Sequence, residues 1–217
     1  KLENIRMGPK PNKYKIPFYT NNINQFYLVA SECADKVVFV SKWLEKIYLE
    51  LGMELSKSSV IMSGSDTSIF KDYDNKEKES KLTKIVTHHW SSHKNKGFEG
   101  YLQLDSLINS KKWKNKISFS YIGNISKEFN FDNTEIIDPL SGIELAQKLS
   151  ENDIYFTASI NEPSGNHHIE AALCGLPVLY LNSGGIPEYC KGFGVSINSI
   201  DELEDKLEEI IEQKEFY

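Results

Sequence analysis

The chain has 217 residues, of which 40% are hydrophobic and 26% are charged, and its formal net charge at pH 7 is −6. This balance is typical of a globular protein with a substantial core, and it excludes a disordered chain, a collagen-like repeat and a disulfide-dense miniprotein. An acidic chain in which Arg6 is the only arginine also argues against general binding of nucleic acid.

The first part of the chain combines an irregular segment with a few short elements. Residues 1–25 are rich in Pro, Lys and Asn and predict an irregular lead-in. Ser41 is the expected N-cap of a helix, and Gly52 is its expected end. The expected elements are helices at 26–34 and 42–51 and strands at 36–40 and 60–62.

A charged stretch separates two parts of the sequence. Residues 71–84 hold almost no apolar side chains, which is typical of a linker or of a solvated loop. Since the length is about 1.4 times that of an average domain, we expect two unequal parts. The predicted domains are residues 1–70 and residues 71–217.

Strands and helices alternate after the charged stretch. The expected strands lie at 84–87, 117–122, 134–138, 153–157, 177–181 and 195–197, and the expected helices at 98–110, 141–150, 166–174, 186–189 and 200–214. Ser141 and Glu144 have the spacing of a capping box. Short, continuously apolar strands indicate parallel strands buried on both faces, so the predicted fold class is α/β with a doubly wound parallel sheet. Ligands bind at the carboxyl ends of the strands in such a sheet.

Two loops that follow strands stand out by their polar residues. Loop A covers residues 88–97 and loop B covers residues 158–165, and both are expected to open on the same edge of the sheet. Every histidine of the chain lies in or beside them: His88, His89, His93, His167 and His168. This clustering places the candidate functional site at these two loops.

Loop B has the composition of an anion site between two carboxylates. Glu162 precedes a predicted helix, Glu170 lies about one turn inside it, and Gly165 allows close approach to the backbone. Amide groups at a helix N-terminus attract phosphate. A phosphate attached to polyhydroxylated groups, as in a nucleotide sugar, would fit this arrangement.

The histidines leave more than one interpretation open. His89 and His93 are four residues apart, and His167, His168 and Glu170 are neighbours, so a metal site is one alternative. Zinc needs three or four converging ligands, and histidines that line a phosphate or sugar pocket are the other alternative. The chain has only three cysteines, and this odd, sparse count favours free thiols in a reducing compartment and a cytoplasmic location; none of them lies in a CxxC pair.

The run from Asn161 to Glu188 resembles the signature of the retaining glycosyltransferases of the GT-B fold, family four. The lysine–glycine pair Lys96–Gly97 is similar to the pair in that family's first strand–loop, and residues 34–70 look like the end of its N-terminal domain and hinge. The matching signature residues are Glu162, Pro163, Gly165, Glu170, Ala171, Gly175, Pro177, Val178, Gly184, Gly185 and Glu188.

The resemblance implies a Rossmann-like donor-binding domain and a role for each matched residue. Lys96 would bind the donor diphosphate and Glu162 would contact the transferred sugar, and both are the expected catalytic residues. Glu170 would hold the ribose hydroxyls. The other expected substrate-binding positions are Gly165, Asn166 and His167 at the phosphate, His89 and His93 in the pocket, and Leu140 and Gly142 at the nucleobase. No metal and no cofactor is expected, because lysine and amide groups take the metal's place.

The chain departs from the family pattern in three ways. Trp90 stands where the family often has an arginine, for which Lys94, His93 or His89 are possible substitutes, and Ser164 stands where phenylalanine is more common. Most of the acceptor-side domain is missing, so we expect the chain to be a piece of a longer protein. The expected partners are a nucleotide-sugar donor with UDP or GDP and a sugar or lipid-linked acceptor. Peripheral membrane association would involve the missing part.

Other functions compete with sugar transfer. A sugar isomerase or phosphorylase with the same two-domain architecture is one alternative, although the Glu-Pro-x-Gly form of loop B favours a transferase. A non-catalytic module that binds nucleotide sugars is another. A Rossmann-type oxidoreductase is disfavoured, because no GxGxxG follows a strand.

Overall fold

The computed structural model describes residues 23–73 and 81–213. These residues form two compact units that divide after Met62. The lead-in predicted for residues 1–25 lies outside the described residues up to residue 22, and so do residues 74–80 of the charged stretch. In the described part of the chain, no helix is long and apolar enough to cross a membrane.

The first unit is a small α/β segment around a short parallel strand pair. Ser41 is the N-cap as expected, because its Oγ accepts a hydrogen bond of 3.2 Å from the Leu44 N–H. The core of this first unit contains Phe39, Tyr48 and Met53. The elements are α1 (Ile23–Cys33), β1 (Val37–Phe39), α2 (Lys42–Glu50), the 3₁₀ helix η3 (Leu55–Lys57) and β2 (Ser58–Val60), with β2 earlier than the predicted strand at 60–62.

The second unit is built on a wholly parallel sheet. Within the described residues this sheet has six strands in the order β5-β4-β3-β6-β7-β8. If β3 is counted as the first strand, the order is 3-2-1-4-5-6, which is that of a doubly wound Rossmann-like fold, and the predicted fold class is confirmed. The strands are β3 (Thr83–His89), β4 (Ile117–Gly123), β5 (Glu135–Ile137), β6 (Ile154–Thr157), β7 (Val178–Leu181) and β8 (Gly194–Ile197).

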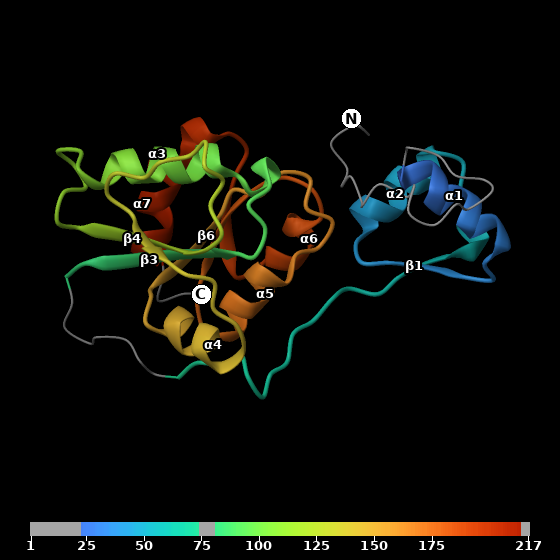
Figure 1. The fold of residues 1–217 in the computed structure, drawn as a ribbon, viewed down its shortest axis with the longest axis horizontal. Coiled ribbons are helices and arrows are strands. Elements are labelled where there is room, and N and C mark those ends of the chain that lie inside the picture. The colour runs from blue at the N-terminus through green and yellow to red at the C-terminus, as the bar shows by residue number, and fades with distance from the viewer. Residues whose placement is uncertain (1–22, 74–80, 214–217) are drawn as a thin grey trace. The chain divides into compact units, whose positions relative to one another are not determined.

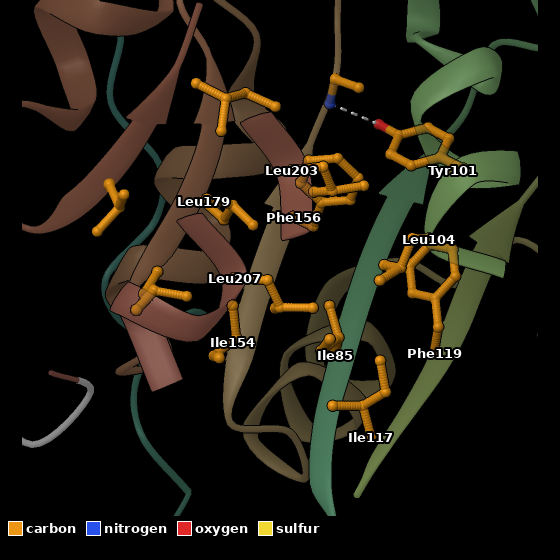
Figure 2. Close-up of a cluster of buried hydrophobic side chains, with 14 of the residues drawn as sticks. Ile85, Tyr101, Leu104, Ile117, Phe119, Ile154, Phe156, Leu179, Leu203 and Leu207 are labelled. Carbon is orange, nitrogen blue, oxygen red and sulfur yellow. Dashed lines mark hydrogen bonds between the residues drawn. The ribbon is translucent and has the colours of Figure 1, made fainter. Parts of the chain in front are cut away.

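Helices cover both faces of this sheet (Figure 1). Adjacent strand residues point to opposite faces, so Ile85 and Phe156 enter one core while Val86 and Tyr155 enter the other. Figure 2 shows the first core, in which Tyr101 of α3 and Leu203 and Leu207 of α7 pack against the strands. One face carries α3 (Phe98–Ile108) and α7 (Leu203–Gln213), the latter preceded by η5 (Ile200–Glu202), and the other carries α4 (Gly142–Ser150), α5 (Asn166–Leu173) and α6 (Ile186–Cys190).

The two units divide before the boundary that the sequence predicts at residues 70 and 71. Phe70 is buried in the core beneath α4 and α5, and Ile69 packs against that core. The Ser63 N–H also donates to the Tyr189 hydroxyl at 2.9 Å. These contacts hold residues 63–70 in the second unit. The assignment of the first unit to the end of an acceptor-side domain stays a prediction.

Two local predictions are wrong. His88 and His89 end strand β3 instead of lying in loop A, because β3 pairs with β4 as far as His89 and Gly123. Ser141 is the N-cap of α4, but its side chain makes no capping hydrogen bond, so the predicted capping box does not form.

Candidate active site

The centre of the sheet positions the candidate site. The strand order reverses between β3 and β6, and a ligand crevice is expected outside the carboxyl ends of the strands at this point. The segments after these two strands meet there, since the Ile160 N–H donates to the Asn95 carbonyl at 2.8 Å. Both loops therefore open on one edge, as the sequence predicts.

Glu162 in loop B forms an ion pair with Lys96. The Lys96 Nζ lies 2.5 Å from the Glu162 Oε2, and the two side chains are 19% and 20% exposed. Lys96 ends the 3₁₀ helix η4 (Lys94–Lys96) directly before α3. The pair places one cation and one carboxylate side by side at the rim of the sheet.

The backbone of Glu162 is held by the turn after β7. The Gly185 N–H donates to the Glu162 carbonyl at 2.8 Å. Gly184 has φ +67°, and a Cβ atom on it would lie 2.3 Å from the Glu162 carbonyl oxygen. Glycine at this position therefore allows two loops to pack backbone against backbone.

Gly184→Ala is expected to lower the free energy of unfolding by about 2 kcal/mol, because a left-handed alanine is strained and its methyl group overlaps the Glu162 backbone. Urea unfolding measures the change. Gly192→Ala is the matched control. Gly192 has φ +100° but open space around it, so alanine there causes backbone strain without any steric overlap. Equal losses in the two variants would contradict the packing argument.

A cavity of about 370 Å³ opens beside the end of β3. Glu170, on α5, forms part of its wall, and the Glu170 Oε2 lies 2.9 Å from the His88 Nε2. The Ser65 Oγ lies 3.5 Å from the Glu170 Oε1. The cavity is lined by Ile69, Phe70, His88, His89, Trp90, Ile122, Gly123, Pro139, Leu140, Ser141, Gly142, Leu145 and Glu170.

Three histidines next to the cavity are buried and uncharged. The ring centroids of His89 and His167 lie 4.8 Å apart, and those of His167 and His168 lie 4.9 Å apart. Burial lowers the pKa of His89 and His167 well below 6.5 and lowers the pKa of His168 to about 3, and Lys96 adds to each shift. A neutral His89, with its Nε2 2.6 Å from the Tyr101 hydroxyl, carries no positive charge, so it does not fit the role of substitute for the arginine that the resemblance leads us to expect at Trp90.

Buried polar atoms without hydrogen-bond partners gather at the same edge of the sheet. Of the seven such side-chain atoms in the described residues, all but the Ser110 Oγ belong to this region. Buried polar atoms are normally paired, so a cluster of unpaired ones calls for a partner such as water, an ion or a polar ligand. The atoms are His88 Nδ1, Ser159 Oγ, Ser164 Oγ, His167 Nε2 and both ring nitrogens of His168.

Gly165 brings the end of loop B close to the start of α5. Its φ is +81°, and a Cβ atom there would lie 2.9 Å from both the Glu162 Cγ and the His167 Nε2. Amide groups of the first turn of α5 begin directly after it. Loop B and α5 thus link the Lys96–Glu162 pair to the histidines and to the cavity.

The structure brings most of the predicted site residues together. Lys96 and Glu162 pair, and Glu170, His89, Leu140 and Gly142 share the cavity. Asn166 is exposed at the start of α5. His93 is exposed and caps η4 by accepting from the Asn95 N–H, and it is not among the lining residues.

No individual binding role was predicted from the sequence for three residues at the site, although His88 was among the clustered histidines and Trp90 among the departures from the family pattern. His88 and Trp90 line the cavity, and Ser65 approaches Glu170. The signal for His88 was its place at the end of a strand at the functional edge. The contact of Ser65 depends on the course of residues 63–70 along the second unit, which has no signal in the sequence. Across the described ranges, no group of three or more His, Cys, Asp or Glu side chains is arranged to hold a metal ion.

More than half of the chain matches the model of one protein family. Residues 93–217 match the family model described as glycosyl transferases group 1. The chain therefore belongs to the family of group 1 glycosyl transferases. None of the curated proteins compared with it matches.

Solved structures share the fold at low sequence identity. Sucrose-phosphate synthase from Thermosynechococcus elongatus matches 97% of the chain with a TM-score of 0.71 and 16% identity. Anabaena Alr3699/HepE, in complex with UDP and glucose, matches 90% with a TM-score of 0.69 and 17% identity. A glycosyltransferase from Rickettsia africae matches 91% with a TM-score of 0.67 and 22% identity. The chain covers 58%, 59% and 59% of these structures, which is less than two thirds of their length.

Proposed function

We propose that the chain is the donor-binding half of a retaining glycosyltransferase of family four, which transfers a sugar from a nucleoside diphosphate sugar. One observation carries the proposal: the two signature glutamates lie at the same edge of the sheet, on loop B and on the helix that follows it. Glu162 pairs with Lys96 at the rim, and Glu170 forms part of the cavity wall. A nucleotide sugar has its transferred sugar at one end and its nucleoside at the other, joined by a diphosphate, and these two ends would match Glu162 and the cavity.

The donor would lie along this site from the cavity to the rim. The cavity would take the nucleoside, with Leu140 and Gly142 near the base and Glu170 at the ribose. The diphosphate would lie at Gly165 and the first amides of α5, where a helix N-terminus favours an anion. The sugar would then reach Glu162.

The residues at the rim would stabilise the charge that develops during transfer. The bond between the anomeric carbon and the diphosphate breaks, and a bond from that carbon to the oxygen of an acceptor hydroxyl forms on the same face, while the proton of that hydroxyl passes to the departing diphosphate. Lys96 and the α5 amides would stabilise the negative charge on the departing diphosphate. Under this proposal a metal ion is not required. NMR of the anomeric proton in the product, made by the whole protein, tests retention.

The donor's base and the partners of the reaction are part of the proposal. UDP is favoured by the complexes of Alr3699/HepE with UDP and glucose, and GDP is the alternative. The acceptor would be a sugar or a lipid-linked sugar, and the reaction would take place in the cytoplasm. Calorimetric titration of the folded chain with UDP, GDP and ADP tests donor binding. Absence of heat with all three would overturn it.

Glu170→Ala is expected to weaken binding of the preferred nucleotide about tenfold, because a hydrogen bond to a charged acceptor contributes about 1.5–3 kcal/mol. The same titration measures the loss. Glu99→Ala removes an exposed glutamate near the start of α3 and is the control for a general change in charge. Unchanged affinity in Glu170→Ala would show that this carboxylate does not touch the nucleotide.

A further inference from the structure

Hydrogen bonds of its backbone hold His88 in place near the end of β3. The His88 N–H donates to the Tyr155 hydroxyl at 3.2 Å. The same hydroxyl donates to the His88 carbonyl oxygen at 3.3 Å. The residue also pairs with Ile122 of β4 in the sheet register. The imidazole therefore extends from a rigid strand in the middle of the sheet.

Among the residues that the structure describes, the side chain of His88 makes one polar contact, and it is to Glu170. The His88 Nε2 lies 2.9 Å from the Glu170 Oε2, and the two side chains are 10% and 16% exposed. A carboxylate only accepts hydrogen bonds, so the Nε2 carries the proton and donates it. The His88 Nδ1 is buried and has no hydrogen-bond partner within residues 23–73 and 81–213.

Glu170 keeps capacity to accept further hydrogen bonds on the cavity side. Its Oε2 accepts from His88, and its Oε1 faces the Ser65 Oγ at a long 3.5 Å. A carboxylate has about four acceptor positions, so both oxygens can still accept from a ligand. Without His88, this carboxylate would lose the strand-held donor that orients it and would be free to turn toward water.

We propose that His88 is a positioning residue that orients Glu170 to accept hydrogen bonds from ribose hydroxyls, and that it thereby sets the preference of the site for ribonucleotides over 2′-deoxyribonucleotides. The inference rests on the proposed function, because it takes the ligand to be a nucleotide. A site built around a substrate hydroxyl discriminates strongly against the analogue that lacks it, provided that the acceptor is held in place.

A purely structural role for His88 makes a different prediction. Its ring packs at 5.5 Å from the Tyr155 ring and 6.2 Å from the His167 ring, in edge-to-face geometry. If packing were its only role, a substitution of His88 would weaken the binding of ribonucleotides and of deoxyribonucleotides to the same extent. The two roles therefore separate when both kinds of nucleotide are measured.

The experiment compares two variants with two nucleotides on the whole 217-residue chain. His88→Phe keeps a ring but removes the donor, and His88→Gln keeps a donor near the Nε2 position. Each is titrated with UDP and 2′-deoxy-UDP, or with the corresponding GDP or ADP pair if the unchanged chain prefers that base. Urea unfolding establishes that each variant is folded.

We expect the unchanged chain to bind the ribonucleotide about tenfold or more tightly than the deoxyribonucleotide. The deoxyribonucleotide lacks the hydroxyl that would donate a hydrogen bond to the charged Glu170. His88→Phe should reduce that preference at least about fivefold while changing deoxyribonucleotide affinity less than about twofold. His88→Gln should restore most of the preference. In a Glu170→Gln background, His88→Phe should have no further effect on it.

Each other outcome overturns a defined part of the argument. If His88→Phe weakened the binding of both nucleotides equally, or left the preference for the ribonucleotide unchanged, the positioning role would be overturned. The proposal of donor binding would stay intact. If His88→Phe does not fold, an unchanged preference in Glu170→Gln would overturn the role. No binding of any nucleotide by the folded, unchanged chain would overturn the proposed function, and this inference with it.

Discussion

Lys96→Met is expected to weaken binding of a nucleoside diphosphate about a hundredfold, because the anion loses a charge-assisted hydrogen bond and meets an uncompensated carboxylate. Lys96 lies 2.5 Å from Glu162, and both side chains are about four-fifths buried. Methionine keeps the length of the side chain and removes the charge. Glu162 would then face the diphosphate without its cation.

Glu162→Gln should act in the opposite direction. Glutamine keeps the shape of the side chain but removes the negative charge that neutralises Lys96, so a diphosphate should bind about threefold to tenfold more tightly. Transfer of sugar by the whole protein should fall in the same variant, because Glu162 is proposed to contact the sugar. Tighter binding together with lost turnover would separate the two roles of the pair.

Isothermal titration with the preferred nucleotide measures both effects. Lys94→Met is the matched control, because Lys94 is exposed at the start of the same 3₁₀ helix η4. If Lys94→Met and Lys96→Met weakened binding equally, the loss would reflect net charge and not the position of Lys96. Weaker binding in Glu162→Gln would show that this carboxylate helps to hold the diphosphate.

The fold of the second unit could be predicted because its strands are short and continuously apolar. Runs such as residues 85–86 and 154–156 are buried on both faces, which only a sheet covered by helices on both sides allows. The edge that carries the site followed from the same pattern. The first unit was also predicted in outline, since Ser41 caps its helix as expected.

The detailed contacts of the site could not be predicted from the sequence. The His88–Glu170 pair depends on two extra residues of strand β3 and on the register of β3 against β4. The division after Met62 depends on the packing of Phe70 into a distant core. The sequence marked His89 as a ligand-binding residue, but it does not show that burial, together with the charge of Lys96, lowers the pKa of this imidazole well below 6.5.

The histidines should make the protein sensitive to acid. Burial lowers the pKa of His89 and His167 well below 6.5 and that of His168 to about 3, so the folded chain keeps all three neutral near pH 5.5. The unfolded chain takes up protons on each of them below pH 6.5. Since stability rises with pH wherever the unfolded state binds more protons, the free energy of unfolding should fall as the pH falls below 6.5.

Each such histidine should contribute about 1.4 kcal/mol over this whole window, because the unfolded chain takes up most of its proton between these pH values, so the three together should cost about 4 kcal/mol between about pH 7.5 and about pH 5.5. Urea unfolding at the two pH values, followed by circular dichroism, measures the difference. His168→Gln should reduce that difference by about one third, whatever it does to stability at neutral pH.

His93→Gln is the matched control, because His93 is exposed and should leave the pH dependence unchanged. If His168→Gln left the pH dependence as large as in the unchanged chain, His168 would not be held neutral by its burial. Donor binding should oppose the effect of acid, because a diphosphate at its proposed place beside His167 would stabilise the protonated imidazole and because a ligand of the folded state raises its stability. The loss of stability at about pH 5.5 should therefore be smaller with saturating nucleotide than without it.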